Sequence, residues 1–302
     1  MLNPNDTSKT DNRQIPTLQS MELGGILDNA LSLYRNNFRL FLGIISIYIV
    51  WIGLQEAVVV WLLEGSDAPN LDTLISDVDY LLDNLVYMFS IGVSVVASSA
   101  IYLGRRLTFR GALQQFRSRF PVYLGGSLLF LMPYTILIVD SIEMSTLRAL
   151  LNLLSLPFLS VFYISWVFYG PVILLEKFTA MEAFGRSRIL VRGTWMRVCR
   201  IIFAILLLEI GVYYILGNSL GVVFALLGIV QEGSLMETIG DLLRLKYEDM
   251  RPTSLDSLIM YIVYLGAEAF ALPIYAIGMT LFYYDLRIRK EGFDIEMRAR
   301  NS

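Results

Sequence analysis

The chain has 302 residues, of which 56% are hydrophobic and 17% charged, and its formal net charge is −3. An ordinary soluble protein carries about 25% charged residues, and a soluble chain this apolar would expose patches that aggregate. The composition therefore excludes a soluble protein and predicts an integral membrane protein. The sequence has no histidine and one cysteine, which excludes histidine catalysis, an intramolecular disulfide and a cysteine-ligated metal cluster. No cofactor is expected.

The chain begins with about twenty polar residues that include Pro4 and Pro16 and lack the apolar core of a signal peptide. We interpret residues 1–20 as a disordered cytoplasmic lead. A transmembrane domain is expected over residues 21–285, and a cytoplasmic tail over residues 286–302.

Six apolar segments are long enough to cross a bilayer, which takes about 20 residues of helix. They are residues 40–63, 85–103, 121–139, 147–175, 201–228 and 258–284. Residues 64–83, with six carboxylates and no basic residue, are expected to form an outside loop. If the six segments cross the membrane, 20 of the 24 Lys and Arg lie on the same side of it as the N-terminus. Because short loops rich in Lys and Arg stay in the cytoplasm, both termini are predicted to be cytoplasmic.

Each odd-numbered span is preceded by a short amphipathic segment, at residues 27–38, 109–120 and 181–195. The first two share the pattern Ala-x4-Arg-x2-Phe, beginning at Ala30 and Ala112, and the third keeps Ala183 and Arg188. We interpret these segments as interfacial helices with their apolar faces in the acyl boundary and their arginines at the headgroups. Two capping boxes predict helix starts: Thr179 with Glu182 on the cytoplasmic side, and Ser234 with Glu237 outside.

The predicted fold is an all-α membrane protein with six transmembrane helices. They form three hairpins, each preceded by a cytoplasmic amphipathic interfacial helix, in repeats at about residues 21–104, 105–176 and 177–285. The alternative is that short cytoplasmic loops of membrane proteins are generally basic and amphipathic, so that the resemblance between the segments is no true repeat.

Three carboxylates, Glu56, Glu209 and Glu268, lie inside predicted spans and form a candidate intramembrane polar site. A charge at the bilayer centre costs ~3 kcal/mol on insertion scales, so such groups face the bundle interior or water. They suit a proton or cation path. The alternative is that they are protonated or hydrogen-bonded to a neighbouring helix. Asn152, Asn218 and Gln55 are expected to form hydrogen bonds between helices.

Exposed arginines of the cytoplasmic loops are candidate contacts for anionic lipids, whose headgroups attract each such charge by ~1 kcal/mol. They are Arg105, Arg106, Arg110, Arg188 and Arg192. The alternative is that these arginines only set the topology. A nucleic-acid partner is not expected, because the charges lie within a turn or two of the membrane.

Three segments carry a resemblance to a known family: GILDNALSLYRNNFRLFLG from Gly25, GPVILLEKFTAMEAFGRSRILVRGTWMRV from Gly170, and YYDLRIRKEGFDIEM from Tyr283. Together they resemble an uncharacterised prokaryotic membrane-protein family. That family is similar to the membrane domain attached to some glycerophosphoryl diester phosphodiesterases. The resemblance implies a multi-pass module of the prokaryotic inner membrane. The phosphodiesterase activity is not carried over, because this chain has neither a histidine nor room for the catalytic barrel.

The residues that match this family are expected to form an ion-pair network on the cytoplasmic surface. Asp285 is expected to pair with Arg287 or Arg289 of the tail, against Glu176 and Arg186. The candidate network also includes Asp28 and Arg35. Such a network would clamp the tail under the bundle.

The expected function is a non-enzymatic membrane module that scaffolds a membrane or envelope partner or shapes local lipid. The sequence lacks a Walker loop, a dinucleotide fingerprint, HExxH and a Ser-His-Asp triad. The main alternative is a transporter or channel that uses Glu209 and Glu268. The third hypothesis is a lipid-modifying enzyme, in which only carboxylates could act as catalytic groups.

Overall fold

The computed structural model describes residues 19–63, 69–138, 146–229 and 255–301, and every regular element within them is a helix. Most of the predicted lead over residues 1–20 lies outside these ranges. The outer capping box of Ser234 and Glu237 also lies outside the described residues. The side chain of Glu56 is likewise outside the described part of the chain, although its backbone lies in a helix.

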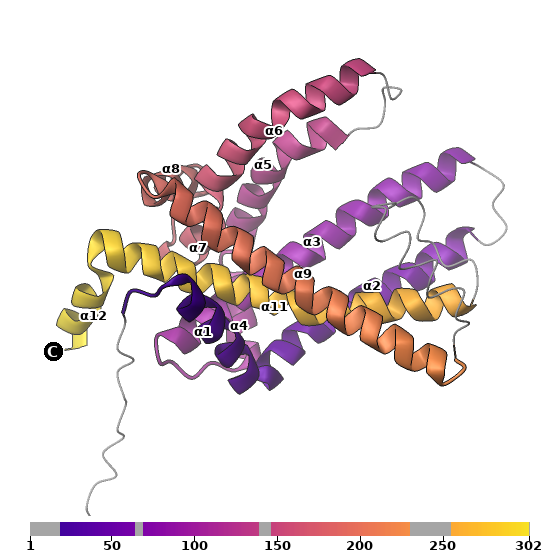
Figure 1. Cartoon of the computed structure of the whole chain (residues 1–302), viewed down its shortest axis with the longest axis horizontal. Coiled ribbons are helices and arrows are strands. Elements are labelled where there is room, and N and C mark those ends of the chain that lie inside the picture. Colours follow the sequence, from indigo (N-terminus) through magenta and orange to yellow (C-terminus); the bar gives the residue numbers. More distant parts are fainter. Residues whose placement is uncertain (1–18, 64–68, 139–145, 230–254, 302) are drawn as a thin grey trace, which may run out of the picture.

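The described helices follow one another in the order shown in Figure 1. They are α1 (Leu23–Asn36), α2 (Phe38–Leu63), α3 (Pro69–Tyr102), α4 (Phe109–Arg117), α5 (Phe120–Ile138), α6 (Thr146–Trp166), α7 (Tyr169–Pro171), the π-helix η1 (Val172–Glu176), α8 (Ala180–Val191), α9 (Trp195–Leu226), α11 (Leu255–Glu291) and α12 (Phe293–Asn301). The predicted boundary between membrane domain and tail, at residue 285, falls inside α11.

Five helical segments are long and apolar enough to cross a membrane, which marks a multi-pass integral membrane protein. They are Phe38–Gln55, Leu82–Tyr102, Leu154–Glu176, Trp195–Leu226 and Ile259–Glu291. The remaining predicted span, residues 121–139, corresponds to α5, whose apolar part Phe120–Pro133 is shorter.

The start of α3 corrects one prediction. Residues 64–83 were expected to be a loop, but α3 begins at Pro69, well before the apolar segment. Proline suits the first position of a helix, where its missing N–H would have no partner and its fixed φ is already helical. The extension was missed because its residues are acidic. Hydropathy indicates which part of a helix lies in lipid, but it does not indicate where the helix begins.

A short helix precedes a long apolar one three times, as α1 before α2, α4 before α5, and α8 before α9. The alanine shared by the three segments is buried in each, at Ala30, Ala112 and Ala183. The apolar faces were predicted to lie in the acyl boundary. Part of each face packs inside the protein instead, as Ile26 and Phe116 are fully buried. The reason is that neighbouring helices offer these faces a closely packed surface.

Helix α11 forms the centre of the bundle, where it packs against α9, α3, α1 and α2 (Figure 1). Two glycines allow α9 and α11 to approach closely. A Cβ on Gly278 would lie 3.0 Å from Ile205, and one on Gly217 would lie 2.6 Å from Tyr264. Small residues serve this purpose in helix pairs within membranes.

The predicted hydrogen bonds between helices are confirmed at two positions. Gln55 donates to Asp83 over 2.8 Å and joins α2 to α3. Asn218 on α9 accepts from the Tyr264 hydroxyl of α11, also over 2.8 Å.

Helix α8 begins at the predicted capping box. The Thr179 side chain accepts from the backbone N–H of Glu182, and the Glu182 carboxylate accepts from the Thr179 backbone N–H over 3.0 Å. The backbone N–H of Thr179, and then its hydroxyl, hold the pKa of Glu182 below its ordinary value. This cap therefore stabilises the helix fully above the ordinary glutamate pKa, and the stabilisation is lost as pH falls through the lowered pKa.

Replacing Thr179 with alanine is expected to destabilise the start of α8 by roughly 1 kcal/mol, because an N-cap side chain and its reciprocal partner are lost. The measurement is hydrogen exchange of the α8 amides, which should become faster at neutral pH. Thr108→Ala is the control, since the Thr108 side chain caps α4 and not α8. If both variants accelerated exchange in α8 equally, the capping role of Thr179 would be wrong.

Candidate functional site

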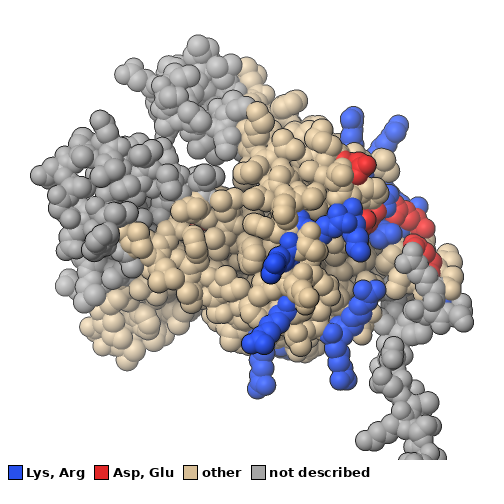
Figure 2. All heavy atoms as spheres, turned by 180° about the vertical axis from the view of Figure 1, so that it is seen from behind, with Lys and Arg blue, Asp and Glu red and all other residues tan. Residues whose placement is uncertain are grey.

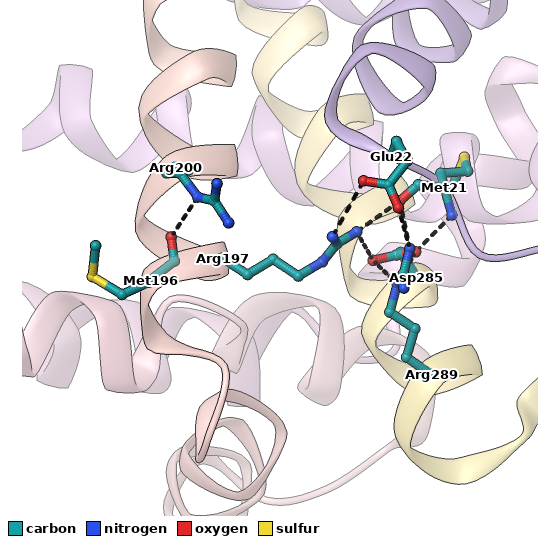
Figure 3. Close-up of polar contacts among 7 residues, drawn as sticks. All are labelled: Met21, Glu22, Met196, Arg197, Arg200, Asp285 and Arg289. Atoms are coloured by element: carbon teal, nitrogen blue, oxygen red, sulfur yellow. Dashed lines mark hydrogen bonds and ion pairs between the residues drawn. The ribbon is translucent and has the colours of Figure 1, made fainter.

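A buried carboxylate, Asp285 on α11, joins three parts of the chain (Figure 3). Its side chain is 0% exposed. It accepts hydrogen bonds from the backbone N–H of Met21 at 2.7 Å, from Arg197 of α9 at 2.9 Å, and from Arg289 at 3.0 Å. Two cations and an amide thus surround one buried anion, which offsets the cost of removing it from water.

The same arginines also hold the chain that enters α1. The carbonyl of Met21 accepts from Arg197 at 2.7 Å and from Arg289 at 3.0 Å. Glu22 lies 3.3 Å from Arg289 and 3.8 Å from Arg197. Figure 3 shows Arg197 and Arg289 reaching the Asp285 carboxylate, whereas Arg200 donates to the Met196 carbonyl of its own helix. We call Met21, Glu22, Arg197, Asp285 and Arg289 the Asp285 cluster.

A second ion-pair cluster is centred on Arg186 of α8. Its Nε lies 3.0 Å from Glu176, the last residue of η1, and its terminal nitrogens contact Glu291 of α11. The hydrogen bond to Glu291 raises the pKa of Arg186 further above its ordinary value. Tyr283 donates to Glu176 as well, and Arg287 lies 3.1 Å from Glu291. We call these five residues the Arg186 cluster.

The expected network is thus present as two separate clusters with partly different partners. Asp285 pairs with Arg289, as predicted, but not with Arg287. Asp28 and Arg35 belong to neither cluster: both are exposed on α1 and form no ion pair within the described part of the chain. Both lie on the face of α1 that turns away from the bundle. They had matched the family pattern, but a sequence match does not place a side chain.

Sequence reasoning missed Arg197, Met21, Glu22 and Tyr283 as members of these clusters. Arg197 had been counted only among the basic residues that set topology. The backbone of Met21 carries no signal in the sequence at all. No sequence signal set Arg197 apart, because it lies four residues before the predicted fifth span, in a loop with five other basic residues.

The candidate lipid-contact arginines are exposed, and none forms an ion pair within the described ranges. They are Arg105, Arg106, Arg110, Arg188 and Arg192. Figure 2 shows Lys and Arg gathered toward one end of the molecule, beside a broad surface that carries no charge. On α8 and at the start of α9, Met181, Ile189 and Met196 are exposed by 72%, 63% and 73% among these charges.

The candidate intramembrane carboxylates have different surroundings. Glu268 on α11 accepts a hydrogen bond of 3.1 Å from the Tyr48 hydroxyl of α2. Glu209 on α9 lines a cavity of about 240 Å³ between helices, and Glu268 is not among the residues that line it. The structure therefore brings Glu209 and Glu268 near each other without placing both on one cavity wall. Glu56 is placed only by its backbone in α2.

No family model matches the chain, and neither the curated proteins nor the solved structures include a match. The resemblance to the prokaryotic membrane-protein family stays a prediction that rests on the three quoted segments.

Proposed function

We propose that the chain crosses the inner membrane of a prokaryote six times, as three hairpins, with both termini in the cytoplasm. The order of short and long helices supports this topology, since it occurs three times. The buried alanine shared by α1, α4 and α8 supports it too, as do the exposed arginines Arg35, Arg117 and Arg188 that follow at the same spacing. The excess of basic residues on one end supports the orientation.

We propose that its function is carried by this basic end, as a non-enzymatic module that binds anionic lipid and presents a fixed surface to a membrane partner. The observation that carries the proposal is the contrast between two sets of arginines. Arg186, Arg197 and Arg289 are used inside the protein to fix α1, α8, α9 and α11 together. The arginines of the loops remain exposed without such partners.

The surface of α8 and the start of α9 combines the two features of an interfacial contact. Met181, Ile189 and Met196 supply exposed apolar area, and Arg188 and Arg192 supply positive charge beside it. Apolar side chains enter the acyl boundary while arginines stay at the phosphates, so the two contributions add. A soluble protein would bury such apolar residues or scatter them singly over its surface.

The lipid contact is tested by Arg188→Gln. Loss of one charge at an anionic surface weakens attraction by ~1 kcal/mol, or about fivefold in affinity. The measurement is the affinity of the purified chain for fluorescent phosphatidylglycerol in neutral detergent. Arg298→Gln serves as the control, because Arg298 is an exposed arginine of α12 outside this surface. Equal affinities for wild type and Arg188→Gln would contradict the contact.

A partner is tested separately, by gentle crosslinking in the native membrane followed by purification. The scaffold proposal expects the chain to be recovered with another membrane or envelope protein in a fixed ratio. Recovery of the chain alone would contradict it.

Transport is the second candidate, favoured by the cavity that Glu209 lines between helices. It expects the double variant Glu209→Gln, Glu268→Gln to abolish flux in proteoliposomes. Unchanged flux, or none in the wild type, would contradict it. Lipid modification is favoured less, because Glu209 is the only carboxylate among the described residues that line the cavity.

A further inference from the structure

The cavity beside Glu209 has an unusual wall for the interior of a membrane protein. Most of its polar lining consists of tyrosines, drawn from five elements: Tyr87 of α3, Tyr123 of α5, Tyr163 of α6, Tyr169 of α7 and Tyr275 of α11. Helices α5 and α6 diverge from α2 and α3 in Figure 1, and the cavity is lined from both sides of this divergence.

Glu209 is the single charged residue among the described residues that line the cavity, and its carboxylate has no hydrogen bond or ion pair within the described part of the chain. Glu268 differs, since Tyr48 donates to it. A carboxylate inside a span costs several kcal/mol unless a partner offsets it. The geometry leaves room for that partner in the cavity.

Three of the tyrosines lie within electrostatic range of Glu209, namely Tyr87, Tyr163 and Tyr275. The hydroxyls of Tyr163 and Tyr275 bond to each other over 3.2 Å. The hydroxyl of Tyr169 donates to Ser127 over 3.0 Å. These three hydroxyls are engaged with neighbours, whereas the Tyr87 hydroxyl forms no hydrogen bond within the described residues. All four tyrosines line the cavity. Aromatic faces attract cations within about 6 Å of the ring centroid, and the attraction is strongest where water is excluded.

The chemistry of the wall favours an organic ammonium over a metal ion. Calcium and magnesium need about six oxygen ligands, and the described residues contain no group of three acidic, histidine or cysteine side chains suited to a metal. One carboxylate with several rings instead matches an alkylated ammonium, which needs a countercharge and polarisable walls. The volume of about 240 Å³ lies just below that of drug-sized pockets and so suits a small ligand.

We propose that this cavity binds a small organic ammonium ion, with the cation against the Glu209 carboxylate and the faces of Tyr87, Tyr163 and Tyr275. The proposal goes beyond the lipid and scaffold role and concerns binding alone. It shares its cavity with the transport candidate but requires no flux. If the ammonium ion bound but no flux were measured, the transport candidate would be contradicted and the binding site would stand.

The first experiment compares choline with its neutral isostere, in which a tert-butyl group replaces the trimethylammonium group. The full chain is titrated with each compound by calorimetry in maltoside micelles, which contain no choline headgroup. Because the two probes share their shape, only a cation site separates them. Choline is expected to bind at least about tenfold more tightly. Equal affinities, or no choline binding in the millimolar range, would overturn the proposal.

The second experiment replaces Glu209 with glutamine, which keeps the shape and removes the charge. Choline affinity should fall by about tenfold or more, while Glu268→Gln, a change of the same kind outside the lining, should lower it much less. Because Glu209 has no partner to lose within the described residues, its glutamine variant should fold normally. Wild-type affinity in Glu209→Gln, or equal losses in both variants, would refute the site.

Tyr87 provides a test that leaves Glu209 intact. Its hydroxyl forms no hydrogen bond within the described part of the chain, so Tyr87→Phe should bind choline as wild type does. Tyr87→Leu removes the ring and should weaken choline binding by about fivefold, in line with the loss of ~1 kcal/mol. The neutral isostere should respond equally to both variants. If phenylalanine and leucine had the same effect on choline, the ring would have no role and the proposal would fail.

Discussion

Replacing Asp285 with asparagine is expected to lower the free energy of unfolding by about 3 kcal/mol. The substitution leaves Arg197 and Arg289, both partly buried, without their shared anion. It also weakens the bond from the Met21 amide, which anchors the entry to α1. The measurement is thermal unfolding in detergent, together with hydrogen exchange over α1 and the first turns of α9.

Asp294→Asn is the matched control, because its partner Arg298 lies 3.9 Å away and is largely exposed. Exposed pairs contribute about 0.5 kcal/mol or less. The two variants carry the same chemical change in the C-terminal part of the chain. If both lowered stability equally, Asp285 would not be the anchor that its geometry indicates. If exchange over α1 did not change, Met21 would be held by other contacts.

Replacing Phe116 with alanine is expected to lower the free energy of unfolding by about 4 kcal/mol, the usual loss for a buried phenylalanine. Phe116 is 0% exposed, and its ring centroid lies 5.1 Å from that of Phe89 and 5.5 Å from that of Tyr123. A cavity would therefore open where α4 meets α3 and α5. The loss should appear as a lower thermal midpoint and faster exchange throughout α4.

Phe158→Ala controls for the size of the change, since Phe158 on α6 is 68% exposed. Its removal leaves no internal cavity, and about 0.5 kcal/mol or less is expected. The comparison also tests the placement of α4. If α4 only rested at the lipid interface, the two variants would have similar effects.

Local features of the sequence predicted much of the helical architecture. The capping box of Thr179 and Glu182 marked the start of α8, because a cap needs only residues three apart. The segments before α2, α5 and α9 were identified by their apolar spacing. The start of α3 was missed, since the acidic residues after Pro69 resemble an exposed loop in hydropathy while remaining compatible with a helix.

The candidate sites were predicted less completely. Glu176, Arg186 and Asp285 were singled out by a family pattern, but that pattern also included Asp28 and Arg35, which lie apart from the clusters. Glu209 was found because a carboxylate in a span is rare. The tyrosines around it had no such signal, because the chain has 17 tyrosines and their spacing does not say which ones share a cavity wall.

The sequence by itself determined that the chain is helical and apolar enough to enter a membrane, because hydrophobic length and helix caps depend on neighbouring residues. Only the tertiary structure decided the partners of the buried charges. Met21 and Asp285 lie 264 residues apart, and Arg197 lies 88 residues from Asp285. They meet because α1, α9 and α11 pack together, and that packing depends on shape over the whole bundle. The same packing leaves the cavity beside Glu209, which no single helix contains.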